Sequence, residues 1–260
     1  MNATLNKPIR FVVMGDSAAF GTGDVVKADR PLGWTYRIAD AIEAPLVYLN
    51  IARPGAKSID LVDHQLPVVE ALKPDIAVIV VGGNDLLRNN FCPIRLKNNL
   101  YEVFSKLHSQ GTKIMTLELH DPSKLLKLPK ALERALLKRV NAVNEVYVEL
   151  ARNFPLIPIK TREISGVNDR KNWHVDMLHP GPRGHMILAS EGKRLLKQLG
   201  VPVSESMVEE IKDFSRREKI MWMILKGTPW FFKRFFDLFP VALFLIIKES
   251  LTPSRDNERS

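Results

Sequence analysis

Cysteine is almost missing from this sequence, and so is any arrangement of metal ligands. Cys92 is the only cysteine among 260 residues. A single thiol excludes an internal disulfide and a cysteine-rich zinc site. No group of histidine and acidic residues has metal-ligand spacing, and Gly21 and Gly23 lack the third glycine of a dinucleotide fingerprint. We therefore expect neither a metal nor another cofactor.

A long uncharged apolar run is also lacking. The longest one, Leu238–Ile247, has 10 residues and contains Pro240, whereas about 20 residues are needed to span a bilayer. The N-terminal residues 1–8 are polar and lack the apolar core of a secretory signal. The sequence therefore predicts a cytoplasmic protein without a transmembrane helix, with peripheral contact to the inner face of the membrane left open.

Acidic residues are fewer than basic ones. The chain has 38 Lys and Arg against 29 Asp and Glu, which gives a net charge of +9 and a pI near 9.6. This balance favours an anionic partner, either lipid or nucleic acid. Hydrophobic residues make up 45% of the chain, which is enough for a full core and excludes global disorder.

Up to about residue 200, short apolar runs alternate with longer helical patterns, as in parallel βαβ units. The expected strands are 9–14, 46–49, 76–81, 113–119 and 156–159. The expected helices are 34–44, 59–72 with a bend or break near Pro67, 96–110, 131–154 and 185–199. We predict an α/β domain over residues 1–200 and a separate helical extension over residues 201–260.

Residues able to catalyse ester hydrolysis stand at the ends of the predicted strands and in the loops that follow: Ser17, Gly55, Asn84, Asp176 and His179. Because the carboxyl ends of parallel strands meet at one edge of a sheet, these residues are expected to lie close together. The alternative for Asp16 and Ser17 taken alone is a simple helix cap.

Each of these residues suits one step of the chemistry. A serine hydroxyl becomes nucleophilic when a base such as His179 takes its proton, and Asp176 can hold that imidazole in one tautomer. The oxyanion needs preorganised donors, which the Ser17 and Gly55 N–H groups and the Asn84 amide can supply.

This set of motifs resembles the SGNH hydrolase superfamily, also called GDSL-type esterases, over about residues 9–200. The similar segments are Gly15-Asp16-Ser17, the loop around Gly55, Gly82-Gly83-Asn84-Asp85 and Asp176-Met-Leu-His179-Pro180. The resemblance implies a flavodoxin-like three-layer α/β/α fold with about five parallel strands, and a Ser-His-Asp triad. Ala18 departs from the family pattern, which usually has a larger apolar residue there.

Two more histidines are candidates for substrate contact. His120 follows a predicted strand, although an Asx turn before Pro122 explains the His120-Asp121 pair equally well. His174 lies two residues before Asp176 and could line the pocket or belong to a solvated loop. Asp85 is expected to fix the geometry of the loop that carries Asn84.

The C-terminal extension has a different composition. Residues 219–248 combine aromatic and aliphatic side chains with Lys and Arg, a pattern that suits the surface of an anionic membrane. The aliphatic run Val241–Ile247 makes nucleic acid an unexpected partner. Packing on the hydrolase domain as a lid, or in a dimer interface, is the alternative.

The sequence therefore predicts a serine esterase acting on a small-molecule acyl ester, a lysophospholipid or a thioester. An acyltransferase of the same fold would use the same residues. The alternative from another class is a catalytically silent module that binds a membrane or a partner.

Overall fold

The computed structural model describes residues 7–27, 30–126, 128–204, 217 and 221. Nearly all of the extension predicted over residues 201–260 therefore lies outside the described residues. Residues 201–204 are an exception, because Val201 and Val203 are buried in the core and the Ser204 N–H donates to the Ala41 carbonyl at 2.8 Å. The domain packing thus continues to Ser204.

The centre of the molecule is a five-stranded parallel sheet in the order β4-β1-β5-β6-β7. Its strands are β1 (Ile9–Gly15), β4 (Leu46–Asn50), β5 (Ile76–Val80), β6 (Lys113–Leu117) and β7 (Leu156–Ile159). Counted along the chain, this is the order 2-1-3-4-5 of the flavodoxin-like fold. The expected strands and their parallel direction are confirmed.

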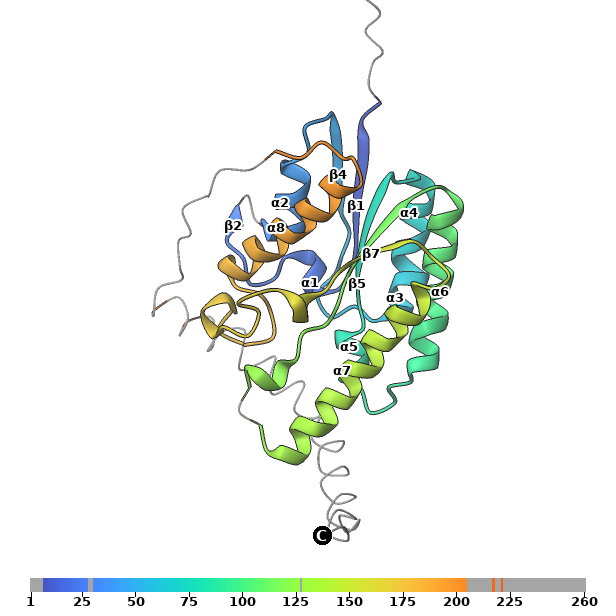
Figure 1. The fold of residues 1–260 in the computed structure, drawn as a ribbon. Coiled ribbons are helices and arrows are strands. Elements are labelled where there is room, and N and C mark those ends of the chain that lie inside the picture. Colours follow the sequence, from blue (N-terminus) through green and yellow to red (C-terminus); the bar gives the residue numbers. More distant parts are fainter. Residues whose placement is uncertain (1–6, 28–29, 127, 205–216, 218–220, 222–260) are drawn as a thin grey trace, which may run out of the picture.

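Helices cover both faces of this sheet (Figure 1). On one face lie α1 (Ser17–Phe20), α2 (Gly33–Asp40) and α8 (Pro182–Gln198). On the other lie α3 (Ser58–Asp60), the π-helical turn Leu61–Gln65, α4 (Leu66–Leu72), α6 (Pro93–Ser109) and α7 (Lys130–Leu150). The fold is thus the predicted three-layer α/β/α arrangement.

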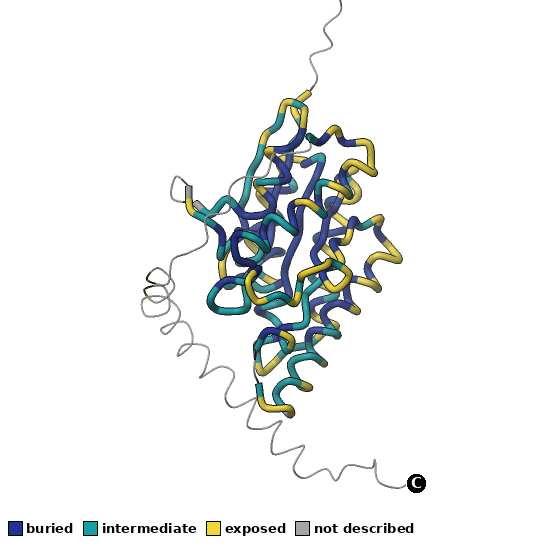
Figure 2. The backbone as a smooth tube through the Cα atoms, turned by 60° about the vertical axis from the view of Figure 1, so that its left-hand side comes forward, coloured by how far each residue is buried: buried dark blue, intermediate teal, exposed yellow. Residues whose placement is uncertain are grey.

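Alternate residues of the sheet feed two separate cores. Phe11 and Val13 of β1 face the α2–α8 side, while Val12 and Met14 face the α6–α7 side. β5 is buried at every position. Figure 2 shows this dark central sheet inside a more exposed helical shell. A central parallel strand buried on both faces explains why its sequence is apolar throughout rather than alternating.

The remaining elements are short and lie mostly at the carboxyl edge of the sheet. They are the β2–β3 hairpin (Val26–Lys27, Arg30–Pro31), α5 (Gly83–Leu86) and the 3-10 turns η2 (Pro122–Lys124), η3 (Thr161–Glu163) and η4 (Arg170–Asn172). The last helix begins at Pro182, three residues before the expected start, because proline suits the first turn of a helix.

Candidate active site

Ser17 stands where β1 turns into α1. Asp16 caps this short helix, with Oδ1 accepting the Ala18 N–H at 2.9 Å. Gly15 has φ = +129°, and a Cβ there would lie 1.9 Å from the Val80 carbonyl oxygen. The chain can therefore make this sharp exit from the sheet only with glycine at position 15. The helix cap that the sequence allows at Asp16 and the half-buried Ser17 both belong to this turn.

The structure brings Ser17 together with a histidine 162 residues further along the chain. Ser17 Oγ lies 2.7 Å from His179 Nε2, and His179 Nδ1 lies 2.8 Å from Asp176 Oδ2. The other carboxylate oxygen, Asp176 Oδ1, accepts the backbone N–H groups of Leu178 and His179 at 2.9 and 3.0 Å. The three side chains predicted to form a triad thus form one hydrogen-bonded chain.

A second imidazole backs the carboxylate. His174 is buried, and its Nδ1 lies 3.3 Å from Asp176 Oδ2. Burial alone would raise the pKa of Asp176, but the hydrogen bonds from His174 and His179 outweigh it and hold that pKa well below its usual range. Asp176 therefore stays ionised beside the imidazole of His179. In this structure His174 contacts the carboxylate rather than solvent.

The Gly55 loop and the Asn84 turn meet beside the serine. The Arg53 N–H donates to the Gly15 carbonyl at 2.9 Å, and Asn84 Nδ2 donates to the Ala56 carbonyl at 3.1 Å. Asn84 Nδ2 also lies 3.5 Å from Asp16 Oδ2. Gly55 therefore sits between two anchored neighbours, and among the described residues no hydrogen bond occupies its N–H.

Asp85 ties these two segments to each other. Its carboxylate accepts the Ser58 hydroxyl at 2.6 Å and the Ser58 N–H at 3.0 Å, while Asn99 of α6 donates to the Ser58 hydroxyl at 2.9 Å. These contacts agree with the loop-fixing role predicted for Asp85.

A family model for the GDSL-like lipase/acylhydrolase family matches residues 13–187. The chain belongs to this family. As a GDSL-like acylhydrolase it is an enzyme that hydrolyses esters. The matched range begins in β1 and ends in α8, so it contains every segment that carries the predicted site residues.

Solved structures agree with this fold. The acetylxylan esterase Axe2 from Geobacillus stearothermophilus is 18% identical with a TM-score of 0.55, covering 72% of this chain and 94% of its own. A lipase/acylhydrolase from Enterococcus faecalis is 17% identical with a TM-score of 0.57, covering 77% and 100%. The esterase EstA from Pseudoalteromonas sp. is 16% identical with a TM-score of 0.56, covering 73% and 97%. A search of curated proteins gives no match.

Two residues of this acylhydrolase site were not singled out as functional from the sequence. Asp16 is buried, and burial raises its pKa to about 6. Gln65 is buried, and its side chain binds both backbone groups of Gly15, accepting from N at 2.7 Å and donating to O at 3.0 Å. Asp16 stands next to Ser17 in sequence, but nothing local to Gln65 signals its contact 50 residues away.

His120, the other predicted contact residue, lies at the end of β6. Its ring packs on Trp173 with 3.8 Å between centroids, and burial lowers its pKa to about 3, so it is neutral. Its Nε2 is enclosed and makes no hydrogen bond to the described part of the chain. The expected Asx turn is also present, since Asp121 caps η2 through the Ser123 N–H at 3.0 Å.

His185 has a different role. It is fully buried, its Nδ1 accepts the Trp34 N–H at 3.2 Å, and its Nε2 lies 3.1 Å from the Thr22 carbonyl. It therefore links α8 to α2 and to the loop after α1. The residues that the structure describes contain no group of His, Cys, Asp and Glu able to hold a metal. None of their helices combines the length and apolar composition that a membrane crossing needs.

Proposed function

We propose that this acylhydrolase is a serine esterase in which Ser17 is the nucleophile, His179 the general base and Asp176 the group that orients the base. The observation that carries the proposal is the continuous chain of short contacts, 2.7 Å from Ser17 Oγ to His179 Nε2 and 2.8 Å from His179 Nδ1 to Asp176 Oδ2. This geometry allows Nε2 to accept the serine proton while Nδ1–H donates to the carboxylate.

The reaction proceeds in two halves. Ser17 Oγ attacks the ester carbonyl carbon as its proton passes to His179, and the imidazolium then protonates the departing alcohol. The acyl group remains on Ser17 as an ester. A water molecule, deprotonated by His179, attacks this acyl-enzyme and releases the carboxylic acid. His174 and His179 together keep Asp176 ionised, which stabilises the imidazolium in both halves.

The oxyanion of each tetrahedral intermediate is stabilised by the Ser17 and Gly55 N–H groups and by the Asn84 amide. The contacts of Arg53 with Gly15 and of Asn84 with Ala56 support this role, because they tie the Gly55 loop to the end of β1 before Ser17 and to the Asn84 side chain. Asn84 Nδ2 must turn one N–H from a protein acceptor toward the oxyanion. Loss of one such donor typically lowers kcat by about 100- to 1,000-fold.

The test measures p-nitrophenyl acetate hydrolysis by wild type, Ser17→Ala, His179→Ala and the double variant. Each single change should remove nearly all activity, and the double variant should be no worse, because the two residues act as a unit. Labelling by a fluorophosphonate probe should be lost in Ser17→Ala; the similar esterase EstA was solved inhibited by monoethylphosphonate.

Ser109→Ala and His64→Ala serve as controls, because both side chains are exposed. They should retain wild-type rates. A Ser17→Ala variant with wild-type turnover would show that another residue is the nucleophile. Faster p-nitrophenol release on addition of an alcohol acceptor would assign acyl transfer as well as hydrolysis to the enzyme.

A further inference from the structure

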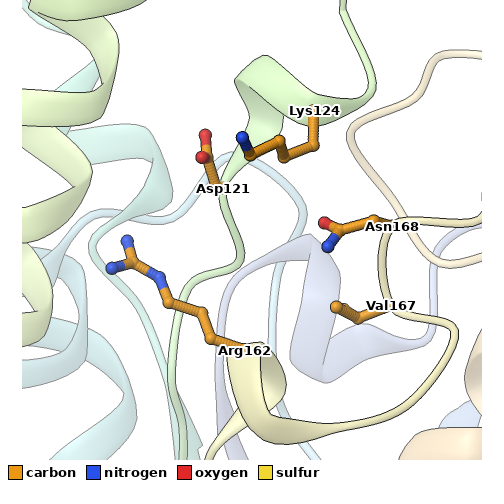
Figure 3. Close-up of a pocket in the computed structure, with 5 residues that line it drawn as sticks. All are labelled: Asp121, Lys124, Arg162, Val167 and Asn168. Atoms are coloured by element: carbon orange, nitrogen blue, oxygen red, sulfur yellow. The ribbon is translucent and has the colours of Figure 1, made fainter.

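A cavity of about 180 Å³ opens at the carboxyl ends of β6 and β7 (Figure 3). It is lined by Asp121, Lys124, Arg162, Val167 and Asn168. Asp121 and Lys124 belong to the η2 segment and Arg162 to η3, while Asn168 faces them from the loop that follows. The sequence did not mark any of these five residues as a site residue. It predicted only that Asp121 forms a turn.

The cavity adjoins the proposed triad. The Trp173 indole N–H donates to the carbonyl of the lining residue Val167 at 2.6 Å, and the Trp173 ring packs on the His120 ring. Trp173 also pairs with Pro180, the residue after His179, in a β-bridge, and the His174 N–H donates to the His179 carbonyl at 2.9 Å, so the segment that carries the indole lies beside the triad. A substrate bound at Ser17 therefore has a cavity with charged side chains on its β6–β7 side.

The lining offers a cation for an anionic ligand. Arg162 is already engaged, with Nη2 2.8 Å from Asn141 Oδ1 and Nε 3.7 Å from Glu118. Lys124 is exposed, and among the described residues it has no ion-pair partner. Asp121 contributes one carboxylate, whose Oδ1 accepts the Ser123 N–H. The space equals that of about six water molecules, enough for a phosphate group on a short alcohol.

We propose that this cavity receives the alcohol portion of the ester, and that Lys124, with the Asn168 amide, selects alcohols that carry an anionic group such as phosphate. The inference rests on the proposed function, since it places the leaving group relative to Ser17. A charged donor on a phosphate forms a strong hydrogen bond, so the preference is measurable.

The experiment compares two soluble esters with the same acyl group, 1-acetylglycerol 3-phosphate and 1-acetylglycerol. Wild type should show a higher kcat/KM for the phosphate ester. In Lys124→Gln the ratio of the two kcat/KM values should fall about 10-fold, and in Lys124→Glu it should fall further. Added salt should reduce the wild-type ratio, because Lys124 is exposed.

Lys113→Gln is the matched control. Lys113 is exposed at the amino end of β6, on the opposite edge of the sheet, and its replacement should leave the ratio unchanged. An equal ratio in wild type and Lys124→Gln would overturn this inference, even if inorganic phosphate inhibits both. A different result would refute the proposed function itself, namely that the wild-type enzyme does not hydrolyse p-nitrophenyl acetate.

Discussion

At the scale of single residues, the unusual feature of the site is a carboxyl group buried next to the serine. Asp16 accepts the Ala18 N–H at 2.9 Å and lies 3.5 Å from the Asn84 amide nitrogen. It therefore binds the turn that carries Ser17 and faces the donor proposed for the oxyanion. Burial raises its pKa from 3.8 to about 6, so its ionisation in the folded protein is unfavourable.

This pKa predicts a specific pH dependence of stability. Between about pH 4 and pH 6 the folded state holds a proton on Asp16 that the unfolded chain releases, so the unfolding free energy falls as pH rises. The loss reaches about 3 kcal/mol above pH 6. Asp16→Asn keeps an oxygen to cap α1 but does not titrate, so it should become more stable than wild type as pH rises through this range.

Urea unfolding at pH 4.5 and pH 7.5 measures this difference. The exposed Asp40, changed to Asn, is the control and should follow wild type at both pH values. If Asp16→Asn differs from wild type by the same amount at both pH values, Asp16 does not titrate in this window. A more stable Asp16→Asn enzyme with lower activity would show that the carboxyl is kept for function.

At the scale of elements, the end of β1 is held by a helical segment that is irregular where it contacts β1. The segment expected to bend near Pro67 is interrupted just before it by the π-helical turn Leu61–Gln65. This turn ends at Gln65, whose amide pairs with both backbone groups of Gly15. π-helical turns often occur at functional sites, and here the turn anchors the strand that delivers Ser17.

Gln65→Leu should therefore damage the site from a distance. The buried Gly15 N–H loses its acceptor, which costs about 1–3 kcal/mol. The Gly15 carbonyl keeps its bond from the Arg53 N–H. Thermal and urea unfolding should show this loss, and kcat should fall more than KM rises because Ser17 is displaced rather than the substrate pocket.

Gln198→Leu makes the same chemical change at an exposed position near the end of α8 and should be close to wild type. Equal stability of the two leucine variants would mean that the Gly15–Gln65 pairing is replaced by another partner.

At the scale of the whole molecule, the net charge of +9 and the composition of residues 219–248 point to an anionic surface. We propose that these residues, which lie almost entirely outside the described part of the structure, attach the enzyme to anionic membranes. Their basic side chains would meet the headgroups while the aromatic and aliphatic ones enter the interface. Each basic residue near such a surface contributes about 1 kcal/mol.

Co-sedimentation with phosphatidylglycerol vesicles tests this proposal on the full-length chain. Binding should rise with anionic lipid content, fall with salt, and weaken strongly when Lys226, Lys233, Arg234 and Lys248 are changed to Gln. The control changes four exposed lysines of the hydrolase domain to Gln, namely Lys106, Lys113, Lys171 and Lys197. Absence of binding, with aggregation of a chain truncated after Ser204, would instead favour packing on the domain or in a dimer.

The sequence by itself determined the fold class and the set of candidate residues. Apolar runs and loop-forming residues are local signals, since a strand buried on both faces must be apolar along its whole length. They predicted all five strands and their parallel direction. The helix ends were predicted less accurately, since two helices begin earlier than expected, at Pro93 and Pro182. Proline lacks a backbone N–H, but the first residues of a helix have no intrahelical acceptor for that group, so proline is tolerated there.

Only the tertiary structure decided which residues share the site. Ser17 follows β1 and His179 lies in the loop before α8, so their 2.7 Å contact depends on the tertiary arrangement. The contacts of Gln65 with Gly15 and of His174 with Asp176 likewise depend on side-chain directions. The raised pKa of Asp16 depends on burial by distant segments. The cavity around Lys124 likewise exists because separate loops close around one space, and no short stretch of sequence encodes such an enclosure.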